Sequence, residues 1–136
     1  MDMKEKIGRD FSELDLNCAE STMAGACEAL GIELAEGELK VMGGFGGGLG
    51  CGRLCGALSG SIAALGKLLV TDRAHVTEGL GKACGEYCAL FEKEFGGIDC
   101  ADLRARLIPP GGKCNSIVER NAEMLEEYIR SLRKEG

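Results

Sequence analysis

The chain lacks Trp entirely and has little of several other residue types. Its 136 residues include one His, two Pro, two Tyr and four Phe. A single imidazole excludes catalytic zinc and non-haem iron sites that draw several histidines from one chain. With so few aromatic residues, the core must consist of Leu, Ile, Val, Ala and Met, with much close backbone contact. That composition suits closely packed helices.

Positive charge and long apolar runs are also scarce. Sixteen basic residues stand against 22 acidic ones, a formal charge of -6, and a chain that repels phosphate is a poor partner for nucleic acids or anionic membranes. The charged segment 1–6 precedes no apolar signal segment, and Lys67 interrupts the least polar stretch, 54–70. We therefore expect a cytoplasmic protein that binds neither nucleic acid nor membrane.

Helical periodicity dominates what is present, and the length suits one domain spanning residues 1–136. No alternation long enough to form a sheet appears, so the predicted fold class is all-α, a compact bundle of about five to six helices with short connections. Asn17 with Glu20 forms a predicted capping box, and Gly31 ends that helix. The predicted helical segments are 3–16, 18–30, 35–42, 51–70, 74–95, 99–107 and 114–134, with the glycines near residue 80 favouring a kink.

Glycine is abundant, with 22 residues, and the run Gly43–Gly50 predicts a glycine-rich loop before the central helix 51–70. This run lacks the Lys-Ser/Thr of a P-loop and follows no strand, so phosphate binding is disfavoured. In the central helix, Gly52, Gly56, Gly60 and Ala64 recur every four residues. This bare face can pack closely within the subunit or across a two-fold axis, and we expect a homodimer.

The eight cysteines are the main functional clue, because thiols in a reducing compartment are more often metal ligands or redox groups than disulfides. Cys18, Cys100 and Cys114 each follow a helix-start signal, and Cys55 follows the glycine loop within a turn or two. At a helix start, free N–H groups and the helix dipole favour the thiolate. The thiolate both attacks disulfides and binds metals, so this placement supports either chemistry.

Two further patterns have the spacing C-x3-C, Cys51 with Cys55 and Cys84 with Cys88. On a helix such residues have Cβ atoms roughly 5 to 6 Å apart, whereas a disulfide needs about 3.5 to 4.5 Å. A metal could bridge either pair more easily than a disulfide. Cys27 should face away from Cys18, and it either joins a second cluster with Cys84 and Cys88 or fills the core.

Several of these segments together resemble the C_GCAxxG_C_C family, whose members are described as redox-active. The resemblance extends over nearly the whole chain, and the glycine loop followed by the CGAxxG pattern is its most specific part. It implies four recurring cysteines, carried over to Cys18, Cys55, Cys100 and Cys114, with a redox or metal-binding role. The segments that carry it are Asn17-Cys18-Ala19-Glu20-Ser21, Phe45 to Gly50, Cys55 to Gly60, Phe91, Gly96 to Cys100, and Cys114 with Val118.

The leading hypothesis is a redox protein in which Cys18, Cys55, Cys100 and Cys114 bind an iron–sulfur cluster and exchange electrons with protein partners. The second is a thiol–disulfide oxidoreductase that uses two of the same cysteines. The third is a structural zinc module, which the absence of C-x2-C knuckles disfavours. The resemblance implies an iron–sulfur cluster as the cargo, since similar modules occur beside c-type haem segments in electron-transfer proteins. This chain has no C-x-x-C-H, so no haem is expected.

Overall fold

A computed structural model describes residues 2–135, and its architecture is all-α, as predicted. Within that range no strand is present, and Leu54 and Asp99 form an isolated bridge. The α-helices are α1 (Met3–Ser12), α2 (Cys18–Leu30), α3 (Gly56–Leu69), α4 (Leu80–Phe95), α5 (Cys100–Leu107) and α6 (Asn115–Glu135). Shorter helical turns are η1 (Glu38–Phe45), η2 (Gly48–Gly52) and η3 (Ala74–Val76).

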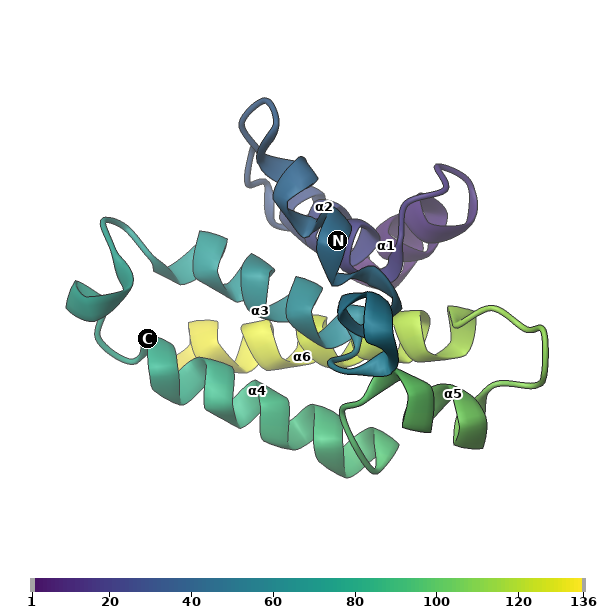
Figure 1. Cartoon of the computed structure of the whole chain (residues 1–136). Helices are drawn as coiled ribbons and strands as arrows, with labels where there is room; N and C mark the ends of the chain where they lie inside the picture. The colour runs from purple at the N-terminus through teal and green to yellow at the C-terminus, as the bar shows by residue number, and fades with distance from the viewer. Residues whose placement is uncertain (1, 136) are drawn as a thin grey trace.

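Helices α3, α4 and α6 run alongside one another, and the α1–α2 pair packs across them (Figure 1). Helix α2 contacts α3 most extensively, while α1 lies between α2 and α6. The long helix α6 supplies one apolar face, and its buried residues Val118, Leu125 and Ile129 join Leu58 and Leu65 of α3 in the main core. Within residues 2–135 no helix is long and apolar enough to cross a membrane.

A polar network crosses this core where α3, α4 and α6 meet. Asn121 is fully buried, and its Oδ1 accepts a hydrogen bond of 2.6 Å from the Tyr87 hydroxyl. Asn121 Nδ2 donates to Ser61 Oγ over 2.9 Å and to the Ala57 carbonyl over 3.3 Å. Because a buried polar group is costly when unpaired, this network fixes the register of the three helices. It also anchors the first turn of α3.

The bare glycine face of α3 packs inside the subunit. A Cβ at Gly60 would lie 2.6 Å from the Ala19 carbonyl oxygen, and one at Gly56 would overlap Cys18 Sγ. Glycine is therefore required here for close backbone approach between α2 and α3. Helix α2 covers this face, so the close packing expected of it occurs within the subunit. The expected homodimer stays a prediction.

Several predicted boundaries are wrong for one physical reason, left-handed backbone. The first helix ends at Ser12 before Asp15, whose φ is 56°. The central helix begins at Gly56 and not at residue 51, because Leu49 has φ 65° and several neighbouring glycines are also left-handed. The predicted helix 74–95 is divided at Gly79, with φ 83°, into η3 and α4.

Candidate functional site

Four helix starts carry the four cysteines that the family resemblance selects. Cys18 is the first residue of α2, Cys100 is the first residue of α5, and Cys55 is the N-cap of α3. Cys114 immediately precedes α6, and its carbonyl accepts the Val118 amide at 2.9 Å. All four line one small cavity of about 20 Å³, closed by Ala57, Leu103, Arg104, Ile117 and Val118.

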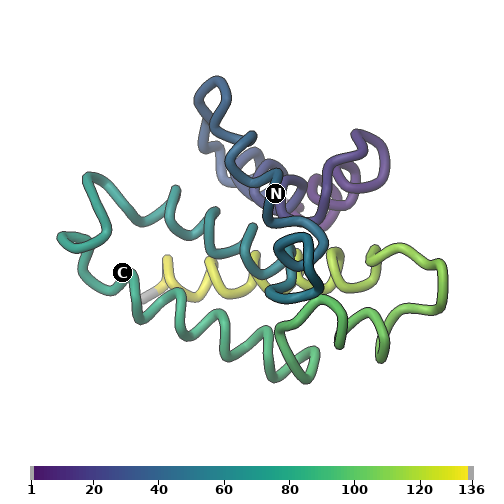
Figure 2. The backbone as a smooth tube through the Cα atoms, viewed as in Figure 1, coloured from purple at the N-terminus to yellow at the C-terminus, as the bar shows by residue number. Residues whose placement is uncertain are grey.

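A short backbone pairing joins the starts of α3 and α5. The Cys55 amide donates to the Ile98 carbonyl at 2.8 Å, and the Cys100 amide donates to the Arg53 carbonyl. Figure 2 shows the segment before α3 coiling beside the connection from α4 to α5. Gly48 lies so close to Cys100 that a Cβ there would come within 2.5 Å of the Cys100 Cβ. The glycine-rich segment therefore brings Cys55 and Cys100 together.

The capping box at Asn17, predicted from sequence, positions Cys18. Asn17 Oδ1 accepts the amides of Ala19 and Glu20, and the Glu20 carboxylate accepts the Asn17 amide at 2.9 Å. Asn17 Nδ2 also donates to the Gly43 carbonyl at 3.1 Å, which ties the start of α2 to η1. The cap thus fixes both the helix start and the segment that covers it.

Arg104 holds the fourth cysteine. Its Nη1 donates to Cys114 Sγ over 2.8 Å, and its Nη2 donates to the Gly112 carbonyl over 3.0 Å. One guanidinium therefore links α5 to the turn that precedes α6. Sequence analysis missed Arg104; its only sequence signal is that it lies one helical turn after Cys100 on the same face.

Burial is the largest influence on the pKa values of Cys18, Cys55 and Cys100. It raises the pKa of Cys55 to about 11, against partial lowering by the Ala57 and Leu58 amides. Burial also raises the pKa of Cys18 and of Cys100. The neighbouring Cys114 further raises the pKa of both Cys18 and Cys100 by charge repulsion. The expectation that a helix start favours the thiolate is therefore wrong for the free thiols of Cys18 and Cys100, because desolvation is the largest influence on both.

The cavity lies beneath an open pocket of about 820 Å³. Cys18, Cys100, Cys114 and Arg104 line both spaces, whereas Cys55 lines only the inner one. Cys55 is 7 % exposed, and the other three thiols are partly exposed. The site is therefore a graded arrangement, with one buried thiol at its base and three thiols between the base and solvent.

The remaining cysteines lie elsewhere, and all eight are free thiols. Cys27 belongs to a separate small core cluster with Ala19, Met23 and Met42, so it fills the core and forms no second site with Cys84 and Cys88. Cys51 is exposed in η2, outside α3, so the expectation that it shares a helix face with Cys55 is wrong. Cys84 and Cys88 are partly buried on α4.

The donor set is compatible with a sulfur-bound group, although the thiols are not gathered around one point. Four cysteines and no imidazole border the cavity, which is the ligand set of many iron–sulfur clusters and of structural zinc. Among residues 2–135, no three or more His, Cys, Asp or Glu side chains are grouped closely enough to hold a metal ion as they stand. Side-chain rotation would have to precede binding.

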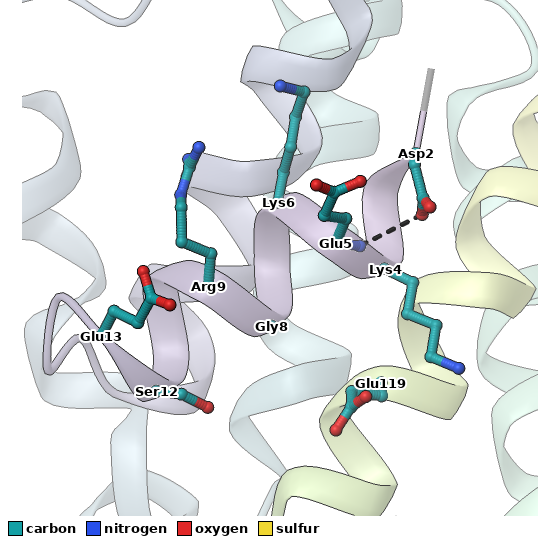
Figure 3. Close-up of a pocket in the computed structure, with 9 residues that line it drawn as sticks. All are labelled: Asp2, Lys4, Glu5, Lys6, Gly8, Arg9, Ser12, Glu13 and Glu119. Atoms are coloured by element: carbon teal, nitrogen blue, oxygen red, sulfur yellow. Dashed lines mark hydrogen bonds between the residues drawn. The ribbon is translucent and has the colours of Figure 1, made fainter.

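Another hollow, of about 1010 Å³, lies away from the cysteines, on the exposed face of α1 (Figure 3). Its lining is charged, including Lys6 and Arg9 of α1 and the C-cap residue Glu13, with Glu119 of α6 facing Gly8. It contains no thiol, and Lys6 and Arg9 already form ion pairs with Glu28. This hollow therefore offers no redox chemistry.

A family model described as "Putative redox-active protein (C_GCAxxG_C_C)" matches residues 16–128, which include all four cysteines of the cavity. No curated protein and no solved structure matches the chain significantly.

Proposed function

The chain belongs to the C_GCAxxG_C_C family of redox-active proteins, and from that premise we propose that Cys18, Cys55, Cys100 and Cys114 bind an iron–sulfur cluster that exchanges electrons with a protein partner. The observation that carries this proposal is the lining of one cavity by these four thiols from four separate helix starts. Side chains as far apart in sequence as Cys18 and Cys114 would not share one cavity by local structure alone.

The surroundings suit a charged sulfur-bound group. Ala57, Leu103, Ile117 and Val118 give the cavity an apolar wall that limits access of water. Backbone amides near Cys18 and Cys55, among them those of Ala19 and Ala57, partly lower the pKa of these two thiols and so favour negative charge on their sulfurs. Both features are ways in which a protein sets the potential of a cluster.

When bound, an iron–sulfur cluster supplies one-electron redox chemistry. The chain's own residues would hold and tune it. Cys55 would anchor the buried side, and Cys18, Cys100 and Cys114 would close the side that borders the open pocket. Arg104 would donate to the Cys114 sulfur, and because such a bond to sulfur stabilises added negative charge, it should favour the reduced state.

The first test is the visible spectrum of protein purified without oxygen, scaled to its iron and acid-labile sulfide content. Brown charge-transfer bands that bleach with dithionite are expected. The variant Cys55→Ser should lose most of the iron and sulfide. Cys84→Ser is the matched control, because Cys84 is a partly buried thiol that lies on α4 away from the cavity, and it should keep both.

Two results would contradict the proposal. Full iron and sulfide content in Cys55→Ser would make the ligand assignment wrong. A colourless protein that contains stoichiometric zinc and unfolds on chelation would replace the cluster with a structural metal site.

A thiol–disulfide oxidoreductase is the second candidate, favoured by the three thiols that line the open pocket. Cys100 and Cys114 border the open pocket, so an incoming disulfide could reach them. Cys55 is too deeply buried to be attacked from solvent. This function requires a metal-free protein that takes up two electrons reversibly and loses that capacity in Cys100→Ser. If the protein failed to react with a disulfide, this function would be excluded.

A further inference from the structure

The open pocket above the cysteine cavity is large enough to hold a small molecule. Its volume of about 820 Å³ lies within the range of roughly 300 to 1,000 Å³ that is typical of small-molecule sites. Because three of the four thiols line the pocket, a molecule bound there would lie directly against the proposed redox centre.

Positive charge is concentrated beside one of those thiols. Arg104 and Lys113 both line the pocket, Arg104 bonded to Cys114 Sγ and Lys113 adjacent to it in the chain. In the described part of the chain neither cation forms an ion pair with a carboxylate. The two hydrogen bonds of Arg104 use two of its five N–H groups. Donors and uncompensated charge therefore remain on this side.

The carboxylates of the pocket come from other elements. Asp15 lies in the α1–α2 connection, and Glu20 lies in the first turn of α2. Glu20 is engaged by the Asn17 amide in the capping box. The whole lining is thus mixed in charge, but the charged group that is hydrogen-bonded to the Cys114 sulfur is the Arg104 guanidinium.

We propose that this pocket is a binding site for a small carboxylate-bearing molecule, which Arg104 and Lys113 hold against Cys114. The proposal rests on the proposed redox role of the cysteine site, against which the bound molecule would lie. In this arrangement Arg104 would donate hydrogen bonds both to the Cys114 sulfur and to the bound carboxylate. The pocket itself consists of protein residues, so it can be tested in the absence of any metal.

The test compares two alkylating reagents of similar size on the metal-free, reduced, full-length chain. Iodoacetate carries a carboxylate and iodoacetamide is neutral. Each forms a bond between the thiolate sulfur and the CH₂ carbon as iodide leaves. Both react with the same thiolate, so the ratio of their rates at Cys114 cancels the extent of ionisation and reports the local charge. Peptide mass spectrometry resolves Cys114, and Cys84 serves as an internal reference.

We expect Arg104→Gln to lower the iodoacetate-to-iodoacetamide ratio at Cys114 about fivefold, the effect of one unit charge at roughly 4 Å in water. Lys113→Gln should lower it about twofold and, because Lys113 makes no bond that shapes the loop, it keeps the test valid if Arg104→Gln misfolds. Arg106→Gln is the matched control, since Arg106 is committed to Asp102 and the Phe95 carbonyl, and it should leave the ratio unchanged.

High salt should reduce the wild-type ratio, because it screens partly exposed charges. An unchanged ratio at Cys114 in both Arg104→Gln and Lys113→Gln would overturn the carboxylate site. That result is independent of iron content, so failure of this proposal and failure of the cluster proposal are separate outcomes.

Discussion

The cysteines at helix starts and the cysteines inside helices occupy different places in this protein. Cys18, Cys55, Cys100 and Cys114 meet at one cavity, whereas Cys27 is buried in a separate cluster and Cys84 and Cys88 remain on α4. Helix interiors fix a side chain on one face of one element. Helix starts are placed by the loops before them, and loops can be drawn to a common point. Convergence here is therefore a property of the connections.

The glycines show the same contrast. Gly56 and Gly60 stand in α3 against the backbone of α2, with no room for a Cβ. Gly81 and Gly85 on α4 have no neighbouring atom within 4 Å of a built Cβ. The region around the cysteine cavity thus depends on close approach of the α2 and α3 backbones. The face of α4 that carries Gly81 and Gly85 does not.

The largest expected effect comes from a substitution at the contact between α2 and α3, beside the cysteine cavity. Gly56→Ala would drive a methyl group into Cys18 Sγ and toward the Ala19 amide. We expect a loss of about 3 kcal/mol in the free energy of unfolding, the upper range for overpacking. Urea unfolding measures it. Bound iron, where present, should fall with it.

Gly85→Ala is the control on α4. Its added methyl group meets no other atom within 4 Å, and Ala is favoured over Gly in a helix interior by about 0.5–1 kcal/mol. This variant should be more stable than wild type. If it were as damaging as Gly56→Ala, the contrast between the two regions would be wrong.

The second prediction concerns pH and the buried thiol. The pKa of Cys55 is raised from about 9 to about 11, so the fold favours the protonated thiol. Stability from this source is fully present below pH 9 and is lost as pH rises toward 11. A shift of two pKa units corresponds to about 3 kcal/mol. Urea unfolding of the metal-free protein in reductant should show the decline.

Cys55→Ala removes the titrating group, so its stability should decline less steeply over the same pH interval. The comparison is between slopes, which separates titration from any packing change. Equal slopes for wild type and Cys55→Ala would show that Cys55 is not the group responsible.

The smallest effect concerns the cap of α2. Asn17→Ala removes the capping bonds to Ala19 and Glu20 and the link to Gly43. We expect a loss of about 1–2 kcal/mol in thermal or urea unfolding. Asp2→Ala, which removes the exposed cap bond of α1 to Glu5, should cost about 0.5 kcal/mol. If both variants lost the same free energy of unfolding, the cap before Cys18 would contribute no more than an exposed cap.

Much of this arrangement is visible in local sequence signals. The capping box at Asn17 is a short pattern, and the structure contains both of its reciprocal bonds. The four-residue glycine spacing identifies a face for close packing, although not its partner. The residues missed by sequence reasoning depend on distant contacts. Arg104 is prominent only because the turn before α6 brings Cys114 and the Gly112 carbonyl within its reach.

The boundary errors have the same origin. Leu49 and Asp15 adopt left-handed backbone, a conformation that non-glycine residues rarely take and that their own sequence does not predict. In the segment before α3, the pairing of Leu54 with Asp99 and the approach of Gly48 to Cys100 accompany this conformation. Cys51 consequently lies outside the helix and in solvent.

The sequence by itself determined the helical class, the start of α2, the glycine face and the four cysteines at or near helix starts, because each depends on residues within a few positions of one another. The tertiary structure decided that α2 covers the glycine face, that the four thiols share one cavity and that Arg104 bonds to Cys114. Those outcomes depend on burial and on long-range backbone pairing. Desolvation, which also raises the thiol pKa values, exists only once the helices have packed.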